Sequence, residues 1–379
     1  MRTIPFTKPY FSDVARAEIL VAIDRILASG QLILGEYTVK LEAAFAAYTG
    51  CADAVTSSTC TSALQMCLEH YDVRGREVLV PAAGFITDVT VVKWAGGTPV
   101  LVDTDPATLS FDLDDLARKL TPRTKGLIWV HLTGLISPAW REIVAFARER
   151  GLFLIEDCAH AHGATVAGHK AGSLGDVGCF SFYPTKIMTT GTGGILTTSN
   201  PALARTAREL RNFGKDAGVG AVVREGHDWL LDEVRACLGC FQLQELEENL
   251  AARGRIAQAY QEAFAGVAGV RCLTVPADQR PSWYHYTLFV DPPIDYDRLA
   301  TGLSTRHGIP TKPIYPPLHH ERIFRDLDTG TLGQSEAMLG RSLCLPLYPE
   351  MTTAQVTAVI AAVKSELAAQ ASAALPISR

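Results

Sequence analysis

The residues most able to do chemistry lie in two segments, Glu156–Ala164 and Gly172–Thr198. In the first segment, Asp157 follows a short apolar run that predicts a buried strand. Groups just beyond the carboxyl ends of strands line the ligand crevice of an open α/β sheet. A carboxylate there needs a positive partner, because an unpaired buried charge is costly. Asp157 is therefore a candidate binding-site anion, and the alternatives are a helix N-cap or a buried ion pair.

In the second segment, Lys186 lies in a polar loop between two apolar runs that predict strands, Gly178–Phe182 and ILTT (residues 195–198). A glycine-rich turn that contains Gly191, Gly193 and Gly194 follows the lysine. Burial lowers the pKa of a lysine, so its free amine becomes available as a nucleophile. The structural alternative is a lysine that pairs with a carboxylate or extends to solvent.

A third segment, Thr56–Leu68, places small hydroxyl residues before an apolar helix. Backbone N–H groups at a helix N-terminus, together with Ser and Thr hydroxyls, bind phosphate. The alternative is a simple helix cap. Taken together, a phosphate cradle, an acid at a strand end and a loop lysine are the parts that a pyridoxal phosphate site needs.

Strands and helices alternate along the first two thirds of the chain. Short apolar runs without alternation suit strands that are buried on both faces. Four such runs are Glu77–Pro81, Pro99–Asp103, Gly126–His131 and Leu152–Asp157. Helical patterns are found at Asp13–Ser29, near Tyr37–Tyr48, at Asp112–Leu120 and at Trp140–Arg150. This rhythm predicts an α/β fold with a mainly parallel sheet and helices on both faces.

The C-terminal third predicts a smaller α+β domain. Leu230–Arg255 is expected to form one long helix, followed by another helix, a strand-like YHYTLFV and a region rich in Pro and Tyr. A closing helix is expected near Thr353–Leu367. We therefore expect a large α/β domain over residues 1–255 and a small α+β domain over residues 256–379.

The bulk composition argues against several function classes. A length of 379 residues with 47% hydrophobic residues suits one large core and a smaller second domain. The formal net charge is −5 and no basic stripe stands out, so we expect no nucleic-acid partner. No apolar stretch approaches the ~20 residues of a membrane span. The N-terminal residues lack the apolar region of a signal peptide, so we expect a cytoplasmic protein without a membrane partner.

The nine cysteines are scattered through apolar segments, and their odd number does not fit a disulfide framework. Cys237 and Cys240 form a lone CxxC inside an expected helix. No second Cys or His pair has metal-ligand spacing, so we expect buried thiols and no metal site.

The order of motifs along nearly the whole chain resembles one known family, the DegT/DnrJ/EryC1/StrS sugar aminotransferases of the fold-type I pyridoxal phosphate superfamily. The matching segments are IPFTKPYF, SGQLILGEYTVKLEAAFAAYTG, VPAAGFITDVTVVKWAGGTPVLVDTDP, EDCAHAHGA, FSFYPTK, GIPTKPIYPPLHH and LPLYPEMT. The resemblance implies an aspartate aminotransferase-like fold, pyridoxal 5′-phosphate as the cofactor and a homodimer.

The resemblance also implies roles for individual residues. Lys186 would hold the cofactor as a Schiff base and shuttle a proton, while Asp157 would bind the pyridinium nitrogen. Phe85 and His160 would lie against the two faces of the ring. The expected phosphate ligands are Thr61, Ser62 and Ser181, together with Asp228 of the partner subunit. The residues expected to border the substrate site are Tyr315, His319 and His320.

Four positions depart from the family pattern. Cys60 replaces a glycine of the phosphate turn, and Thr192 replaces the acid of the usual GEGG. Asp228 replaces an asparagine that reaches the neighbouring subunit's phosphate, and Leu230 replaces a nearby arginine. An aspartate repels a phosphate dianion unless the aspartate is protonated or a cation bridges the two groups. Either the dimer contact at Asp228 is rearranged or Asp228 serves the substrate.

The activity implied by the resemblance is transfer of an amino group from L-glutamate, or glutamine, to a keto group of a nucleotide-activated deoxysugar, in natural-product or surface-glycan sugar biosynthesis. The first alternative acceptor is a keto-cyclitol, such as an inosose in aminoglycoside biosynthesis. Two alternatives belong to other classes: a pyridoxal phosphate sugar dehydratase and a non-catalytic, sensor-like relative. The dehydratases carry His in place of the Schiff-base lysine, so Lys186 argues against the first. The Lys186–Asp157 pair argues against the second.

Overall fold

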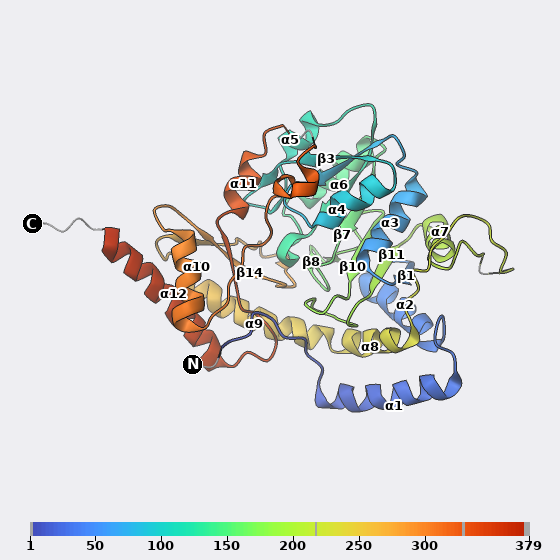
Figure 1. Cartoon of the computed structure of the whole chain (residues 1–379), viewed down its shortest axis with the longest axis horizontal. Helices are drawn as coiled ribbons and strands as arrows, with labels where there is room; N and C mark the ends of the chain where they lie inside the picture. Colours follow the sequence, from blue (N-terminus) through green and yellow to red (C-terminus); the bar gives the residue numbers. More distant parts are fainter. Residues whose placement is uncertain (1–2, 217, 328–329, 375–379) are drawn as a thin grey trace, which may run out of the picture.

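The computed structural model describes residues 3–216, 218–327 and 330–374 (Figure 1). A seven-stranded sheet forms its centre, in the order β1-β11-β10-β7-β6-β2-β3. Within it, β11 runs antiparallel to both of its neighbours, and the other pairings are parallel. The strands are β1 (Asp53–Ser57), β2 (Glu77–Pro81), β3 (Thr98–Val102), β6 (Thr124–Val130), β7 (Phe153–Asp157), β10 (Val177–Ser181) and β11 (Gly194–Thr198).

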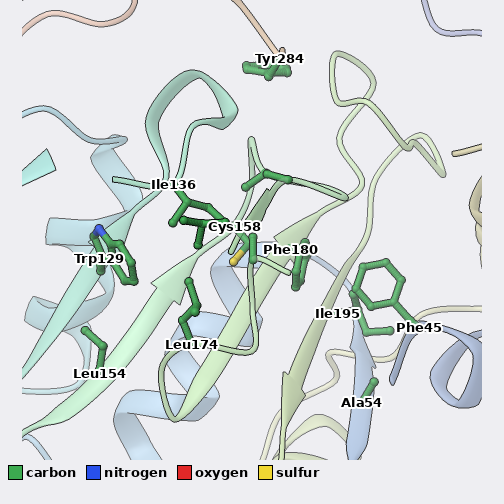
Figure 2. Close-up of a cluster of buried hydrophobic side chains, with 14 of the residues drawn as sticks. Phe45, Ala54, Trp129, Ile136, Leu154, Cys158, Leu174, Phe180, Ile195 and Tyr284 are labelled. Atoms are coloured by element: carbon green, nitrogen blue, oxygen red, sulfur yellow. The ribbon is translucent and has the colours of Figure 1, made fainter. Parts of the chain in front are cut away.

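Successive side chains of a strand point to opposite faces of the sheet. Since the strands of this sheet are buried, both of its faces must be covered, and helices cover both of them. On β6, Leu127 and Trp129 join one apolar cluster and Ile128 joins another. Figure 2 shows the first cluster, in which Phe45 meets Phe180 with ring centroids 4.9 Å apart. The prediction of a mainly parallel sheet between helices is confirmed. The helices of this region are α1 (Asp13–Ser29), α2 (Glu36–Thr49), α3 (Cys60–Tyr71), α4 (Ile86–Trp94), α5 (Leu113–Arg118), α6 (Trp140–Glu149) and α7 (Pro201–Arg211).

The single long helix expected over residues 230–255 is wrong. The structure has two helices there, α8 (Glu233–Gln244) and α9 (Leu246–Phe264), which meet at Glu245. The two helices have different packing partners: α8 packs against α1 and α2, whereas α9 packs Tyr260 and Phe264 into a third apolar cluster. The apolar pattern continues through the junction, so periodicity alone does not reveal the break.

A second, smaller antiparallel sheet lies in the C-terminal part, in the order β12-β14-β15. Its strands are β12 (Val270–Cys272), β14 (Tyr286–Val290) and β15 (Ser342–Leu345), and its helices are α10 (Tyr296–His307), α11 (Gly333–Leu339) and α12 (Thr353–Ala374). Residue 255, the expected domain boundary, lies inside α9, which runs without a break from the central sheet to this second sheet (Figure 1). The division into two domains stays a prediction.

Short elements complete the described chain. They are β4 (Thr104–Asp105), β5 (Ser110–Phe111), β8 (Thr165–Val166), β9 (His169–Lys170) and β13 (Gln279–Arg280), with 3₁₀ turns at Leu132–Gly134, Leu318–His320 and Arg322–Phe324. All nine cysteines are free thiols. Within the described ranges, no helix combines the length and the apolar character that crossing a membrane requires.

Candidate active site

A cavity of about 500 Å³ opens at the carboxyl ends of the parallel strands β6, β7 and β10. Val130, Asp157 and Ser181, the residues at these strand ends, contribute to its wall. The structure brings most of the predicted site residues together here, although they come from distant parts of the chain. The predicted residues that line the cavity are Thr61, Phe85, Asp157, His160, Ser181, Lys186 and Tyr315.

Lys186 enters the cavity from the loop after β10, where its N–H donates to the Tyr183 carbonyl at 2.9 Å. Its Nζ lies 4.6 Å from the centroid of the Tyr284 ring. Burial lowers the pKa of Lys186 to about 8, although the nearby Asp157 carboxylate favours the charged form. At pH 7 about a tenth of such an amine is unprotonated, far more than for an exposed lysine. This lysine is therefore a competent nucleophile and proton carrier.

Asp157 is the last residue of β7, which is held between β6 and β10. Its side chain is buried, and Oδ1 accepts a hydrogen bond from the Ala159 N–H at 2.8 Å. The Asp157 carbonyl also accepts from the His131 N–H at 3.0 Å. A carboxylate fixed in this way at the cavity wall can pair with a cationic group of a ligand.

The N-terminus of α3 forms another part of the wall, through Thr59, Cys60 and Thr61. The N–H groups of Cys60 and Thr61, in the first turn, have no acceptor within the helix. Thr59 is the N-cap: its Oγ1 accepts from the Ser62 N–H at 3.0 Å, and Ser62 Oγ accepts from the Thr59 N–H at 3.1 Å. Ser62 is therefore used in the cap and does not line the cavity. The arrangement fits an anion such as phosphate.

The turn after Lys186 approaches α3 so closely that it requires glycine. A Cβ on Gly194 would lie 2.3 Å from the carbonyl carbon of Thr59. Gly193 and Thr192 line the cavity beside this contact. The glycines of the turn thus let β11 pack directly against the start of the anion-binding helix.

Aromatic rings form the remaining walls. Phe85 is 44% exposed and lies on one side of the cavity. The His160 ring lies near those of Tyr284 and Tyr315, at 4.0 Å and 5.7 Å between centroids. His160 Nε2 is 3.0 Å from the Tyr315 hydroxyl. Burial, together with the charge of Lys186, holds the pKa of His160 well below its usual range, so this imidazole is neutral.

Besides Ser62, three predicted residues lie away from the cavity wall. His319 and His320 direct Nε2 at the same oxygen, Oε1 of Glu336, at 2.8 and 3.3 Å. Asp228 is exposed and its backbone pairs with that of Asn212. The neighbouring Trp229 carbonyl accepts from the Ser58 N–H at 2.8 Å, so this segment lies beside the start of α3. The roles expected for these residues stay predictions.

Sequence reasoning missed several residues of the wall, above all Tyr284 and Lys312. Tyr284 precedes β14, and its hydroxyl is 2.9 Å from Thr185 Oγ1. Lys312 precedes Tyr315 by three residues and brings a positive charge to the cavity. The aromatic run that leads into β14 could have pointed to Tyr284. Lys312 lies inside the matching segment GIPTKPIYPPLHH.

Comparison with known proteins agrees with this geometry. Residues 13–364 match the model of the DegT/DnrJ/EryC1/StrS aminotransferase family. The chain is similar to GDP-perosamine synthase of Caulobacter vibrioides, at 36% identity over 88% of this chain and 91% of that protein. It is also similar to UDP-N-acetyl-3-dehydro-alpha-D-glucosamine 3-aminotransferase of Acidithiobacillus ferrooxidans, at 34% identity over 93% of this chain and 94% of that protein.

Solved structures agree as well. The aminotransferase TlmJ from Streptoalloteichus hindustanus superposes with a TM-score of 0.90 at 34% identity, over 97% of this chain and all of that one. The family resemblance and the fold that it implied are confirmed. The chain belongs to the DegT/DnrJ/EryC1/StrS aminotransferase family, and the protein is an aminotransferase.

Proposed function

We propose that this aminotransferase uses pyridoxal 5′-phosphate to move an amino group from L-glutamate to a keto group of a nucleotide-activated deoxysugar. The observation that carries the proposal is the single cavity in which Lys186, Asp157 and the N-terminus of α3 meet. These groups fit an aldehyde, a ring nitrogen and a phosphate respectively. When bound, the cofactor supplies an aldehyde that condenses with amines and a ring that withdraws electrons from the substrate carbon.

Each residue of the wall then has a defined task. The N–H groups of Cys60 and Thr61 and the Ser181 hydroxyl hold the phosphate. The Asp157 carboxylate binds the protonated ring nitrogen and keeps its proton in place. Phe85 and the neutral His160 would lie against the bound ring. Lys186 Nζ takes a proton from the substrate carbon and returns it, which its pKa of about 8 allows near neutral pH.

The acceptor is proposed from the charge and shape of the cavity together with the relatives. The two similar proteins named above carry a GDP-sugar and a UDP-sugar in their names. Lys312 adds a positive charge to the wall, which suits the carboxylates of glutamate and the diphosphate of an activated sugar. A keto-cyclitol acceptor remains the alternative within the same enzyme class, since it needs the same amino-transfer residues.

We also propose a homodimer. The apolar residues of α8 pack against α1 and α2 within one protomer. The surface left for a partner is instead the outer face of α1, where Leu20 and Leu27 are 69% and 62% exposed. In Figure 1, α1 lies at the edge of the molecule with α8 on one side only. An exposed apolar face of this kind is typical of an interface.

The experiment is a screen of the purified protein with pyridoxal phosphate. Each of several nucleotide-activated keto-deoxysugars and inososes is offered with L-glutamate or L-glutamine as the donor. We expect 2-oxoglutarate from glutamate and an aminated nucleotide sugar by mass spectrometry. Amination of inososes alone would shift the proposal to the cyclitol alternative. Sugar turnover without 2-oxoglutarate would indicate a dehydratase, and cofactor binding without any amine turnover would indicate a sensor-like relative.

A further inference from the structure

A second carboxyl group, that of Asp88 on α4, is fully buried behind the cavity wall. Its Oδ2 accepts a hydrogen bond from the Phe85 N–H at 2.9 Å, as a residue in the first turn of a helix commonly does. Its Oδ1 is also buried, and it has no hydrogen-bond partner among the residues that the structure describes. Helix capping accounts for the hydrogen bond at Oδ2. It does not account for the burial of Oδ1 without a partner.

The titratable groups that face Asp88 are Asp157, Lys186, Cys60 and Tyr315. Burial, followed by the charge of Asp157, raises the pKa of Asp88 well above its usual range. Two buried carboxylates side by side repel each other, so one of them keeps a proton. Asp157 faces the cavity, where a cationic ligand group can pair with it, whereas Asp88 does not line the cavity. Asp88 is therefore the member of the pair that stays protonated.

We propose that Asp88 is a positioning residue whose protonated carboxyl group donates a hydrogen bond from Oδ1 to the carboxylate of Asp157. The Asp157–Asp88 pair then carries one negative charge. Asp157 would be held by two donors, the Ala159 N–H and the Asp88 hydroxyl, and would present its remaining lone pairs to the cavity. The proton on Asp88 needs no further acceptor, and its buried oxygen is satisfied.

The consequence for the cofactor rests on the function proposed above. A donor behind Asp157 stabilises its anionic form, which is the form that pairs with a protonated ring nitrogen. Without this donor, the Asp157 carboxylate keeps only the hydrogen bond from the Ala159 N–H. Asp88 would therefore act on the cofactor through Asp157, without touching it.

Infrared spectroscopy of the full-length protein tests the proton directly, because a protonated carboxyl group absorbs separately from a carboxylate. At neutral pH we expect a carboxylic acid band in the wild type that Asp88→Asn removes. Asp103→Asn is the matched control: Asp103 is also buried, but hydrogen bonds from Ser335 lower its pKa, so it is ionised. An acid band that survives Asp88→Asn, or is absent from the wild type, overturns the proposal. This measurement needs no cofactor.

Titration of each variant with pyridoxal phosphate tests the effect on Asp157. Asn at position 88 still donates a hydrogen bond, whereas Leu does not. Loss of a hydrogen bond to a charged group corresponds to roughly a 10- to 100-fold loss of affinity, so we expect this loss in Asp88→Leu and a substantially smaller one in Asp88→Asn. Equal losses in both variants would mean that Asp88 only caps α4. If Asp88→Leu does not fold, the infrared spectra of the wild type and of Asp88→Asn still test the proposal.

The two tests separate the two proposals. If no variant binds pyridoxal phosphate, the proposed cofactor is wrong, but the infrared band still reports the proton on Asp88. If the wild type binds the cofactor and the band is missing, only the role of Asp88 is wrong.

Discussion

The imidazole of His160 lies nearly parallel to the phenol ring of Tyr284, with ring centroids 4.0 Å apart and an angle of 22° between the planes. The ring also meets Tyr315, whose hydroxyl is 3.0 Å from His160 Nε2. His160 follows β7, Tyr284 precedes β14, and Tyr315 lies between α10 and α11. Their contact is therefore a tertiary feature that fixes the histidine in one orientation at the cavity wall.

Tyr315→Phe removes the hydroxyl from this contact and leaves His160 Nε2 without that partner. A buried polar group without a partner costs about 1–3 kcal/mol, so we expect a fall of that size in the free energy of unfolding. Urea titration measures it. Tyr284→Phe is the comparison, because it keeps the stacking and removes only the contact with Thr185. A Tyr315→Phe variant as stable as the wild type would show that this contact has no energetic weight.

Borohydride reduction of the protein in the presence of pyridoxal phosphate should place a pyridoxyl label on the peptide that contains Lys186. Lys186→Ala should lose the label and all transamination while its circular dichroism spectrum is unchanged. Lys312→Ala is a demanding control, since this second lysine of the cavity wall should leave the label in place. Recovery of the label on any lysine other than Lys186 would overturn the assignment.

Asp157→Asn replaces the anion that faces the cavity with a neutral amide of almost the same shape. The ring nitrogen of the cofactor then loses its charged partner, and we expect kcat to fall by at least ~10²-fold, the scale seen when a key electrostatic partner is removed. Stopped-flow measurement of the half-reaction with L-glutamate isolates this effect from acceptor binding. Half-reaction rates equal to those of the wild type would refute the role of Asp157.

The stability of the protein should fall in mild acid because of its buried neutral histidines. His162 packs against Phe180 and Phe182, and burial lowers its pKa from 6.5 to about 3. Below pH 6.5 the unfolded chain takes up a proton that the folded chain does not, so stability present above pH 6.5 is lost as the pH falls toward 3. The pKa values of His160 and His285 are lowered in the same direction.

Each of these histidines contributes a slope of up to about 1.4 kcal/mol per pH unit within that range. Urea midpoints between pH 8 and pH 5 measure the total slope. His162→Phe should reduce the slope by the share of one histidine. An unchanged slope in His162→Phe would mean that His162 is already protonated in the folded protein.

The assembly can be tested at Asp228. If the segment that contains Asp228 reaches the partner subunit's phosphate, Asp228→Asn removes a like charge and should be tolerated or should tighten cofactor binding. Light scattering at micromolar concentration should show a dimer for both proteins, with or without cofactor. A monomer would contradict the proposed assembly. A large loss of cofactor affinity in Asp228→Asn would mean that the carboxylate itself is a needed ligand.

The sequence by itself predicted the mainly parallel central sheet and singled out Asp157 and Lys186 as candidate site residues. Strands buried on both faces must be continuously apolar, so β2 and β7 could be located from composition alone. Asp157 and Lys186 interrupt this apolar pattern at a strand end and in an adjoining loop. Polar groups at such positions are costly unless they have partners or a ligand, so local reasoning marked them as candidates, and the family resemblance supplied their expected roles.

Only the tertiary structure decided which distant residues complete the site. Tyr284 and Lys312 line the cavity although they lie beside the second sheet, Tyr284 just before β14 and Lys312 paired with Cys344 of β15. The break at Glu245 separates a helix that packs against α1 and α2 from one that packs against β12 and α12, and these partners come from distant parts of the chain. From the sequence, Asp88 is an ordinary residue in the first turn of a helix. It gains its chemistry only because folding removes its second oxygen from water and places it near Asp157, since a carboxyl group takes its protonation state from its surroundings.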